Sequence, residues 1–201
     1  MTHLELRGNL ASNKSVCYTS PAMKETSKVK SIDEMRQVAQ AMRQRGLRLV
    51  FTNGCFELLH VGHIRYLQAA RDLGDALVVG LNADVSVRAI KGPPRPLVPE
   101  AERAELLASL ACVDYVVMFS EPTAENLVAA LRPAIYVKGG DYALVDLSSR
   151  LPDLPTAVGL KIAPEMRVVQ QYGGRVVVLP YSSGHSTTTL IESILQSYKP
   201  G

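Results

Sequence analysis

The stretch FTNGCFELLHVGH, residues 51–63, carries an apolar strand pattern through a small, polar turn and into a helix. Its turn, residues 52–55, contains a glycine, and N–H groups that precede a helix form a ready anion site. His60 and His63 follow at the mouth of the helix, where a spacing of three places both imidazoles on one side. Gly62 between them leaves room against the backbone. Two such donors beside a helix N-terminus are typical of a cradle for phosphate oxygens.

Histidines at a helix start can also have other roles. Either histidine alone would more often be a cap or a surface residue. The pair favours the phosphate cradle, because it flanks a glycine and follows a glycine-containing strand end. Histidine pairs also bind zinc, but Glu57 and Cys55 do not stand in a recognised zinc spacing. We therefore expect no metal site built from protein ligands.

Strand and helix patterns alternate along the rest of the chain. Helical patterns are expected at 31–46, 63–74, 99–111, 122–132 and 186–198, and strand patterns at 47–53, 75–82, 114–119, 134–140 and 175–180. Several strands are apolar on both faces, which is typical of a sheet covered by helices on each side. The order predicts an α/β fold, a Rossmann-like doubly wound parallel sheet with helices on both faces. The Pro-punctuated stretch 143–165 is expected to form a lid or an insertion on the surface.

Length and charge suggest one domain with a basic leader. The chain has 201 residues, which suits one α/β domain at 31–201. Residues 1–30 hold five Lys or Arg against two Glu, so this segment carries the whole net charge of +3. A basic tail on a neutral body is typical of a solvated, flexible leader, and we expect no nucleic-acid partner. The sequence has no long apolar run, so we expect a cytoplasmic protein with no membrane partner. Three cysteines without a CxxC pair indicate free thiols.

Ligands of open α/β sheets bind beyond the carboxyl ends of the strands, so residues there are the candidates for a binding site. Lys91 and Arg95 lie in a loop stiffened by prolines and could hold fixed positive charge over a polyphosphate, although each could equally be a solvated charge. Arg103 on the next helix is a further candidate. The other candidates are Thr52, Asn53, Gly54, Cys55 and Phe56 after the first strand, Asn82 and Asp84 after the second, Lys138, Gly139 and Asp141 after the fourth, and Ser186, Thr187 and Thr188 at the last helix start. Ser186, Thr187 and Thr188 are expected both to cap that helix and to donate to phosphate.

Residues 30–197 resemble the HxGH nucleotidyltransferase superfamily in its cytidylyltransferase-like branch. The resemblance to this branch rests on three segments, FTNGCFELLHVGH, LVVGLNADVSVRAIKGPPRP and GHSTT. Three further segments narrow the choice of family within the branch: PEAERAELLASLACVDYVV, LRPAIYVKGGDY and YGGRVVVLP. Within that branch the chain is similar to adenylyltransferases that make ADP-heptose from a heptose 1-phosphate.

The resemblance implies roles for single residues. His60, His63 and Lys91 would contact the triphosphate and stabilise the transferring phosphoryl group. Nucleotide binding would fall to Thr52, Asn53, Gly54, Cys55, Phe56, Gly62, Arg103, Lys138, Gly139, Asp141, Ser186, Thr187 and Thr188, and we assign Asn82, Asp84 and Arg95 to substrate binding. The family pattern has Asp where this chain has Glu57, which leaves the role of that acid open.

The resemblance also implies partners and leaves alternatives. ATP or CTP and a sugar 1-phosphate would be the substrates, Mg²⁺ would come with the nucleotide, and related enzymes are commonly homodimers. A CTP-dependent enzyme acting on glycerol 3-phosphate is the first alternative. A catalytically silent nucleotide-binding regulator is the second.

Overall fold

The computed structural model describes residues 28–140, 145–146, 163–180 and 186–198. They form a six-stranded sheet in the order β3-β2-β1-β4-β6-β5. The strands are β1 (Leu49–Gly54), β2 (Ala76–Asn82), β3 (Tyr115–Phe119), β4 (Ile135–Gly140), β5 (Val145–Asp146) and β6 (Arg175–Pro180). Five strands are parallel, and the short β5 pairs antiparallel with β6. The expected doubly wound parallel sheet is confirmed.

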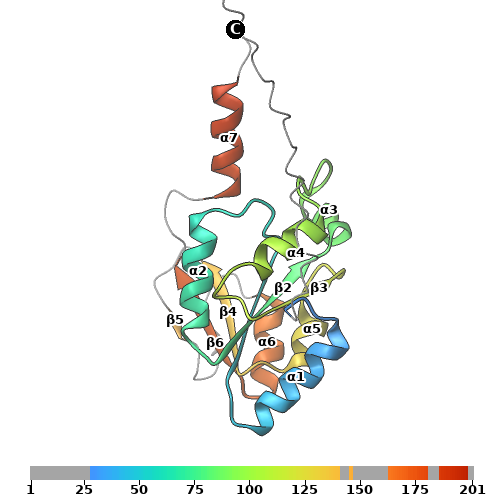
Figure 1. Cartoon of the computed structure of the whole chain (residues 1–201), viewed down its shortest axis with the longest axis vertical. Coiled ribbons are helices and arrows are strands. Elements are labelled where there is room, and N and C mark those ends of the chain that lie inside the picture. Colours follow the sequence, from blue (N-terminus) through green and yellow to red (C-terminus); the bar gives the residue numbers. More distant parts are fainter. Residues whose placement is uncertain (1–27, 141–144, 147–162, 181–185, 199–201) are drawn as a thin grey trace, which may run out of the picture.

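Two layers of helices cover the sheet. The helices are α1 (Ile32–Gln44), α2 (Val61–Arg71), α3 (Asp84–Lys91), α4 (Glu100–Ala108), α5 (Glu125–Leu131), α6 (Pro164–Gln171) and α7 (Thr187–Ser197). Figure 1 shows α1, α5 and α6 grouped together, apart from α2 and α4. The first group packs on a core that includes Phe51 and Tyr136, and α2 and α4 pack on a core that includes Val50 and Leu77. Adjacent residues of β1 therefore bury opposite faces, as the pleat of a strand requires.

Strand order reverses beside β1, which places the ligand region of such a sheet. β1 lies between β2 and β4, so the chain leaves β1 toward one edge and later crosses back to the other. The crevice beyond the carboxyl ends of β1 and β4 is the expected ligand position in an open α/β sheet. The histidine-bearing helix α2 follows β1 directly.

Two helices differ from the sequence expectation. The segment after Asp84 that carries Lys91 and Arg95 was expected to be a loop stiffened by prolines, but α3 occupies Asp84–Lys91 and ends at Gly92, whose φ is +76°. The prolines begin only after that glycine, so they follow the helix and do not interrupt it. Helix α6 begins at Pro164, inside the stretch that we expected to lie outside the regular pattern. Proline is favoured in the first turn of a helix, so Pro164 marks a start there.

The end of the expected leader is part of the sheet edge. The Lys30 N–H donates to the Val116 carbonyl at 2.9 Å, and the Val116 N–H donates to the Lys28 carbonyl at 2.8 Å. Val29 thereby forms a parallel bridge with Val116 of β3. Residues 28–30, which we assigned to a flexible leader, are therefore ordered against β3. Residues 1–27 of the expected leader lie outside the described residues.

Helix α7 extends away from the sheet (Figure 1) and buries none of its eleven residues. Its N-cap is Ser186, whose hydroxyl accepts a hydrogen bond from the Thr189 N–H at 3.0 Å. The expected capping role of Ser186 is thus confirmed. Among the described helices, none combines the length and apolar character needed to cross a lipid bilayer.

Candidate active site at the start of α2

The N-terminus of α2 is available to an anion. Its N-cap is His60, which has extended backbone angles (φ −140°, ψ 169°) and makes no side-chain capping bond. The first turn contains no acidic residue that could neutralise the helix dipole internally. The first N–H groups of a helix lack intrahelical partners, and the dipole adds positive charge there. A phosphate placed at this end would accept hydrogen bonds from these N–H groups and would be attracted by the helix dipole.

The two histidines lie side by side, as their spacing predicted. The His60 and His63 rings stack with centroids 3.9 Å apart and an interplanar angle of 25°. The Phe56 ring packs on His63 from 5.3 Å. Phe56 has a φ of +43°, a left-handed conformation that is unusual for a bulky residue. Gly54 makes this turn possible, because a Cβ there would lie 3.1 Å from the Phe56 ring.

His63 is a neutral imidazole at neutral pH. Burial, followed by the charges of His60 and Lys91, lowers its pKa from the ordinary 6.5 to about 4. Its Nδ1 is buried and has no hydrogen-bond partner among the described residues. A proton on Nδ1 would therefore be a buried, unpaired donor, so the neutral ring is better served by a proton on Nε2. That tautomer presents one N–H donor to a ligand.

The low pKa of His63 predicts a pH-dependent stability. On acidification below pH 6.5 the unfolded chain takes up a proton at this imidazole, while the folded chain does not until about pH 4. The free energy of unfolding therefore falls as pH drops from 6.5 toward 4. Replacing His63 with Gln should remove about 1 kcal/mol of this loss, after allowance for solvent screening. Urea unfolding of the unchanged protein and of His63→Gln at pH 7.5 and pH 5 measures this difference. An equal loss of stability in the two proteins would contradict the low pKa of His63.

A buried carboxylate holds the loop that carries Lys91 and Arg95. Glu57 is 2% exposed and accepts both arms of the Arg95 guanidinium and the Leu97 N–H, the latter at 2.6 Å. The Lys91 ammonium lies 3.5 Å from the same carboxylate. Burial alone would raise the pKa of Glu57, but Arg95, the Leu97 N–H and Lys91 together hold it below its ordinary value. In this structure Arg95, which was expected to bind substrate, pairs with Glu57 instead of presenting a free guanidinium.

Arg103 is a structural residue in this protein. Its side chain is 0% exposed, and its guanidinium donates to the carbonyls of Val98, Cys55 and Asn82 and to the Asp84 carboxylate. These bonds join the carboxyl ends of β1 and β2 to the start of α3. The expectation that Arg103 contacts a nucleotide directly does not agree with this burial. Its role here is to position the strand ends.

Asn82 and Asp84 belong to the same framework. Asn82 is 4% exposed, and its amide donates to the Ser86 hydroxyl at 2.8 Å. Asp84 pairs with Arg103 at 2.7 Å, and its N–H donates to Glu100 at 2.6 Å. Both were expected to bind substrate, yet their side chains are used within the protein. Position at a strand end identified them, but it does not distinguish a ligand contact from a structural bond.

Thr52 and Asn53 point to opposite faces of the sheet. Thr52 is fully buried, and its hydroxyl lies 2.7 Å from that of Tyr66. The Asn53 carbonyl oxygen accepts from Tyr136 at 2.9 Å, and its amide lies 3.5 Å from Glu165. Both side chains are thus bonded within the protein, so their part in the expected cradle is left to their backbone groups. Sequence reasoning missed Tyr66, Tyr136 and Glu165, which carry no motif signal.

Positive charge gathers where β1 ends. Lys91 from α3, Arg103 from α4 and Lys138 from β4 each act on the Cys55 thiol, whose pKa is nevertheless raised, chiefly by burial. Cys55 therefore stays a neutral thiol at neutral pH. Lys138 and Gly139 are half-buried at the end of β4. Asp141 lies outside the described residues, while Ser186, Thr187 and Thr188 stand at the start of α7.

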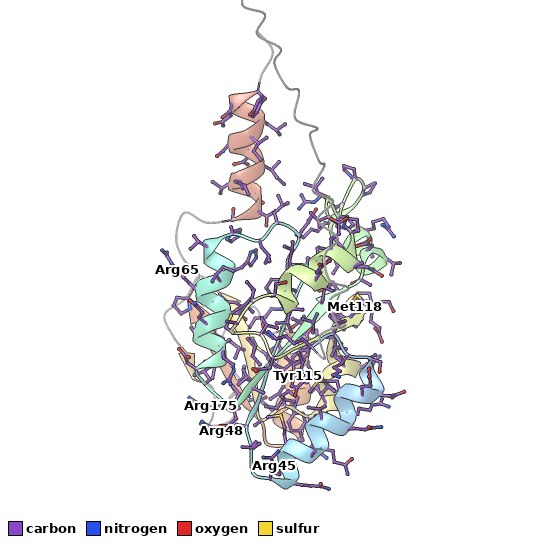
Figure 2. The ribbon with its side chains drawn as sticks, viewed as in Figure 1. Arg45, Arg48, Arg65, Tyr115, Met118 and Arg175 are labelled. Atoms are coloured by element: carbon purple, nitrogen blue, oxygen red, sulfur yellow. The ribbon has the colours of Figure 1, made fainter. Side chains whose placement is uncertain are left out.

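Other arginines lie away from this region. Figure 2 shows Arg45, Arg48 and Arg175 at the end of the molecule opposite α3, and Arg65 on the outer side of α2. Arg48 precedes β1 and Arg175 begins β6, so both belong to the amino ends of strands. Ligands of parallel sheets bind at the carboxyl ends. These four arginines are therefore not candidates for triphosphate contact.

The chain is similar to several known proteins. A family model described as cytidylyltransferase-like matches residues 51–193. The bifunctional protein HldE of Syntrophotalea carbinolica is 49% identical over 180 residues, which make up 90% of this chain and 34% of that protein. The HldE of Geotalea uraniireducens is 51% identical over 168 residues, or 84% of this chain and 31% of that protein. The chain spans about a third of the length of these curated relatives.

A solved structure is also similar. It is described as a lipopolysaccharide core biosynthesis protein from Thermoplasma volcanium, and it is 26% identical with a TM-score of 0.48. The match covers 68% of this chain and 98% of that chain.

Proposed function

The chain belongs to the cytidylyltransferase-like family of nucleotidyltransferases, and we propose that it joins a nucleoside monophosphate to a sugar 1-phosphate, with release of pyrophosphate. The observation that supports this reaction most directly is the stacked His60–His63 pair at an uncapped helix N-terminus. The neutral His63 imidazole, the first N–H groups of α2 and the Lys91 ammonium are all complementary to a triphosphate.

The proposed reaction is attack by an oxygen of the sugar phosphate on the α-phosphorus of the nucleoside triphosphate. The bond from the α-phosphorus to the bridging oxygen breaks, and pyrophosphate leaves. The attacking phosphate is already an anion, so no general base is required. The work of the protein is then alignment and charge stabilisation. His63, as a neutral donor, and Lys91, as a cation, would stabilise negative charge on the phosphoryl oxygens without a proton transfer.

We propose that Mg²⁺ accompanies the nucleotide. In the part of the chain that the structure describes, no three His, Cys, Asp or Glu side chains gather in a way that could hold a metal ion. Two acids at the carboxyl ends of the strands already have partners, since Glu57 pairs with Arg95 and Asp84 with Arg103. This donor set fits an ion held mainly by phosphate oxygens and water, whose contribution would be to neutralise phosphate charge.

ATP and a heptose 1-phosphate are the substrates that we propose. The support is the resemblance of the motifs to heptose 1-phosphate adenylyltransferases and the identity of about half the aligned residues with proteins named HldE. A homodimeric state and a cytoplasmic location remain predictions from the sequence.

Pyrophosphate release measures the proposal directly. The protein is incubated with Mg²⁺ and either ATP or CTP, each paired with heptose 1-phosphate or with glycerol 3-phosphate. We expect release with ATP and the heptose, at least about a hundredfold above the other three pairs, because a site built to bond one substrate rejects an analogue that leaves its polar groups unpaired. Release only with CTP or only with glycerol 3-phosphate would keep the reaction type and change the substrate. Nucleotide binding without release in any pair would favour the regulatory alternative.

A further inference from the structure

Glu57 joins two cations that the sequence assigned to ligands. Its side chain is fully buried, and it reaches Arg95, Lys91 and the Leu97 N–H at once. All three partners lie in the segment from the end of α3 to residue 97, while Glu57 itself follows β1. We call Glu57, Lys91, Arg95 and the Leu97 N–H the Glu57 cluster. One carboxylate thus connects the turn that leads to the histidines with the segment that carries Lys91.

The two cations of the cluster are held differently. Arg95 makes two parallel hydrogen bonds with the carboxylate, and its side chain is 21% exposed. Lys91 approaches at 3.5 Å with one atom, beyond good hydrogen-bond distance, and its side chain is 34% exposed. A bidentate arginine fork is a strong and directional contact, whereas a lysine acts as a mobile point charge. Lys91 is therefore the partner that can leave.

The cluster stays balanced when Lys91 leaves. A buried carboxylate without a partner is costly, but Arg95 supplies a full positive charge and the Leu97 N–H a further hydrogen bond. Lys91 also lies near enough to His63 for its charge to lower the pKa of that histidine. Once released from Glu57, its ammonium could therefore contact an anion bound at the histidines.

We propose that Glu57 is a positioning residue that anchors the 91–97 segment through Arg95 and holds Lys91 ready for transfer to the triphosphate. Binding of the nucleotide moves Lys91 from Glu57 to the phosphate oxygens, and Arg95 keeps the segment in place during the reaction. Glu57 thus competes with the nucleotide for Lys91 in the free enzyme and still supports turnover. This inference rests on the proposed function for the role of the triphosphate, but the anchoring of the segment is independent of it.

Limited trypsin digestion of the whole chain tests the anchoring without any activity. Trypsin cuts after Lys91, because Gly92 follows it, and Pro96 protects the bond after Arg95. Replacing Glu57 with Gln should speed cleavage at Lys91–Gly92 at least about tenfold, because the segment opens more often. Glu57→Asp keeps the negative charge, so its cleavage rate should lie between the rates of the unchanged protein and of Glu57→Gln. The matched control is Glu102→Gln, which removes an exposed carboxylate from α4 and should leave the rate unchanged.

Binding and kinetics test the transfer of Lys91. For Glu57→Gln we expect Mg·ATP to bind as tightly as in the unchanged protein or up to about tenfold more tightly, because a competitor for Lys91 is gone. We expect kcat to fall about ten- to hundredfold, because the segment is no longer aligned. A merely structural role would weaken binding and turnover together. Arg95→Gln should lower kcat similarly, and the double variant should be no worse than either single one, since both break one contact.

The outcomes are separable. Unchanged cleavage at Lys91–Gly92 in Glu57→Gln would overturn the anchoring, whatever the enzyme does. Faster cleavage combined with weaker Mg·ATP binding would overturn the transfer of Lys91, whether or not kcat falls, as would multiplicative effects of Glu57→Gln and Arg95→Gln. If the unchanged protein released no pyrophosphate with any substrate pair, the proposed reaction would fail, while the digestion would still decide whether Glu57 anchors the segment.

Discussion

Replacing His63 with Ala is expected to lower the turnover of nucleotidyl transfer at least about a hundredfold, with the fold retained. The loss of one well-placed donor to developing charge costs about 2.7 to 4 kcal/mol of activation free energy. The His63 ring is stacked on His60, and its Nδ1 has no partner among the described residues, so the change breaks no protein hydrogen bond of that atom. Pyrophosphate release under saturating Mg·ATP measures the effect.

The control for this variant lies on the same helix. Arg65→Ala removes an exposed side chain on the outer side of α2 and should leave turnover within about twofold. Circular dichroism and urea unfolding establish that both variants are folded. If His63→Ala kept the turnover of the Arg65→Ala protein, the histidine would have no part in the reaction.

Replacing Arg103 with Met is expected to cost about 3–5 kcal/mol of the free energy of unfolding, the largest loss of stability that we predict. Methionine fills similar space but donates no hydrogen bond. The Asp84 carboxylate would lose its ion pair, and the carbonyls of Cys55 and Asn82 would lose a buried donor. The urea midpoint measures the loss, with Arg88→Met on the exposed side of α3 as the control. A loss below about 1 kcal/mol for Arg103→Met would contradict the structural role.

The fold could be predicted from sequence because its signals are local and repeated. Continuous apolar strands separated by single amphipathic helices indicate a parallel sheet covered on both faces, and that sheet is observed. The missed helices, α3 and α6, both adjoin prolines, which we interpreted as breaks. In α3 the prolines lie beyond the terminal Gly92, and in α6 Pro164 occupies the first position. A proline indicates that a helix begins or ends nearby. Whether the proline lies just inside the helix or just beyond it depends on packing, which the sequence does not show.

The histidine pair of the candidate site could be predicted from the sequence, but the partners of the charged side chains around it could not. A spacing of three at a helix start favours side chains on one side, and His60 and His63 stack as predicted, although His60 is the extended N-cap and only His63 is helical. The partners of Arg95 and Arg103 come from distant segments, and a cation near a strand end can face a ligand or a carbonyl with equal ease. The partners of Glu57 could not be predicted from the sequence either. Its neighbours in sequence indicate a turn, while its function depends on contacts about 40 residues away.

The pairing of residues 28–30 with Val116 also bears on whether the edge of the sheet can pair with another molecule. A bare sheet edge can recruit a strand from another molecule, and β3 is the edge strand on this side of the sheet. Val29 pairs with Val116 near the start of β3, while Met118 farther along remains 38% exposed. A shortened chain beginning at Ser31 would uncover the Val116 amide and carbonyl beside that apolar side chain. Residues 28–30, which belong to no motif, thus shorten the free edge of β3 to which a strand of another molecule could pair.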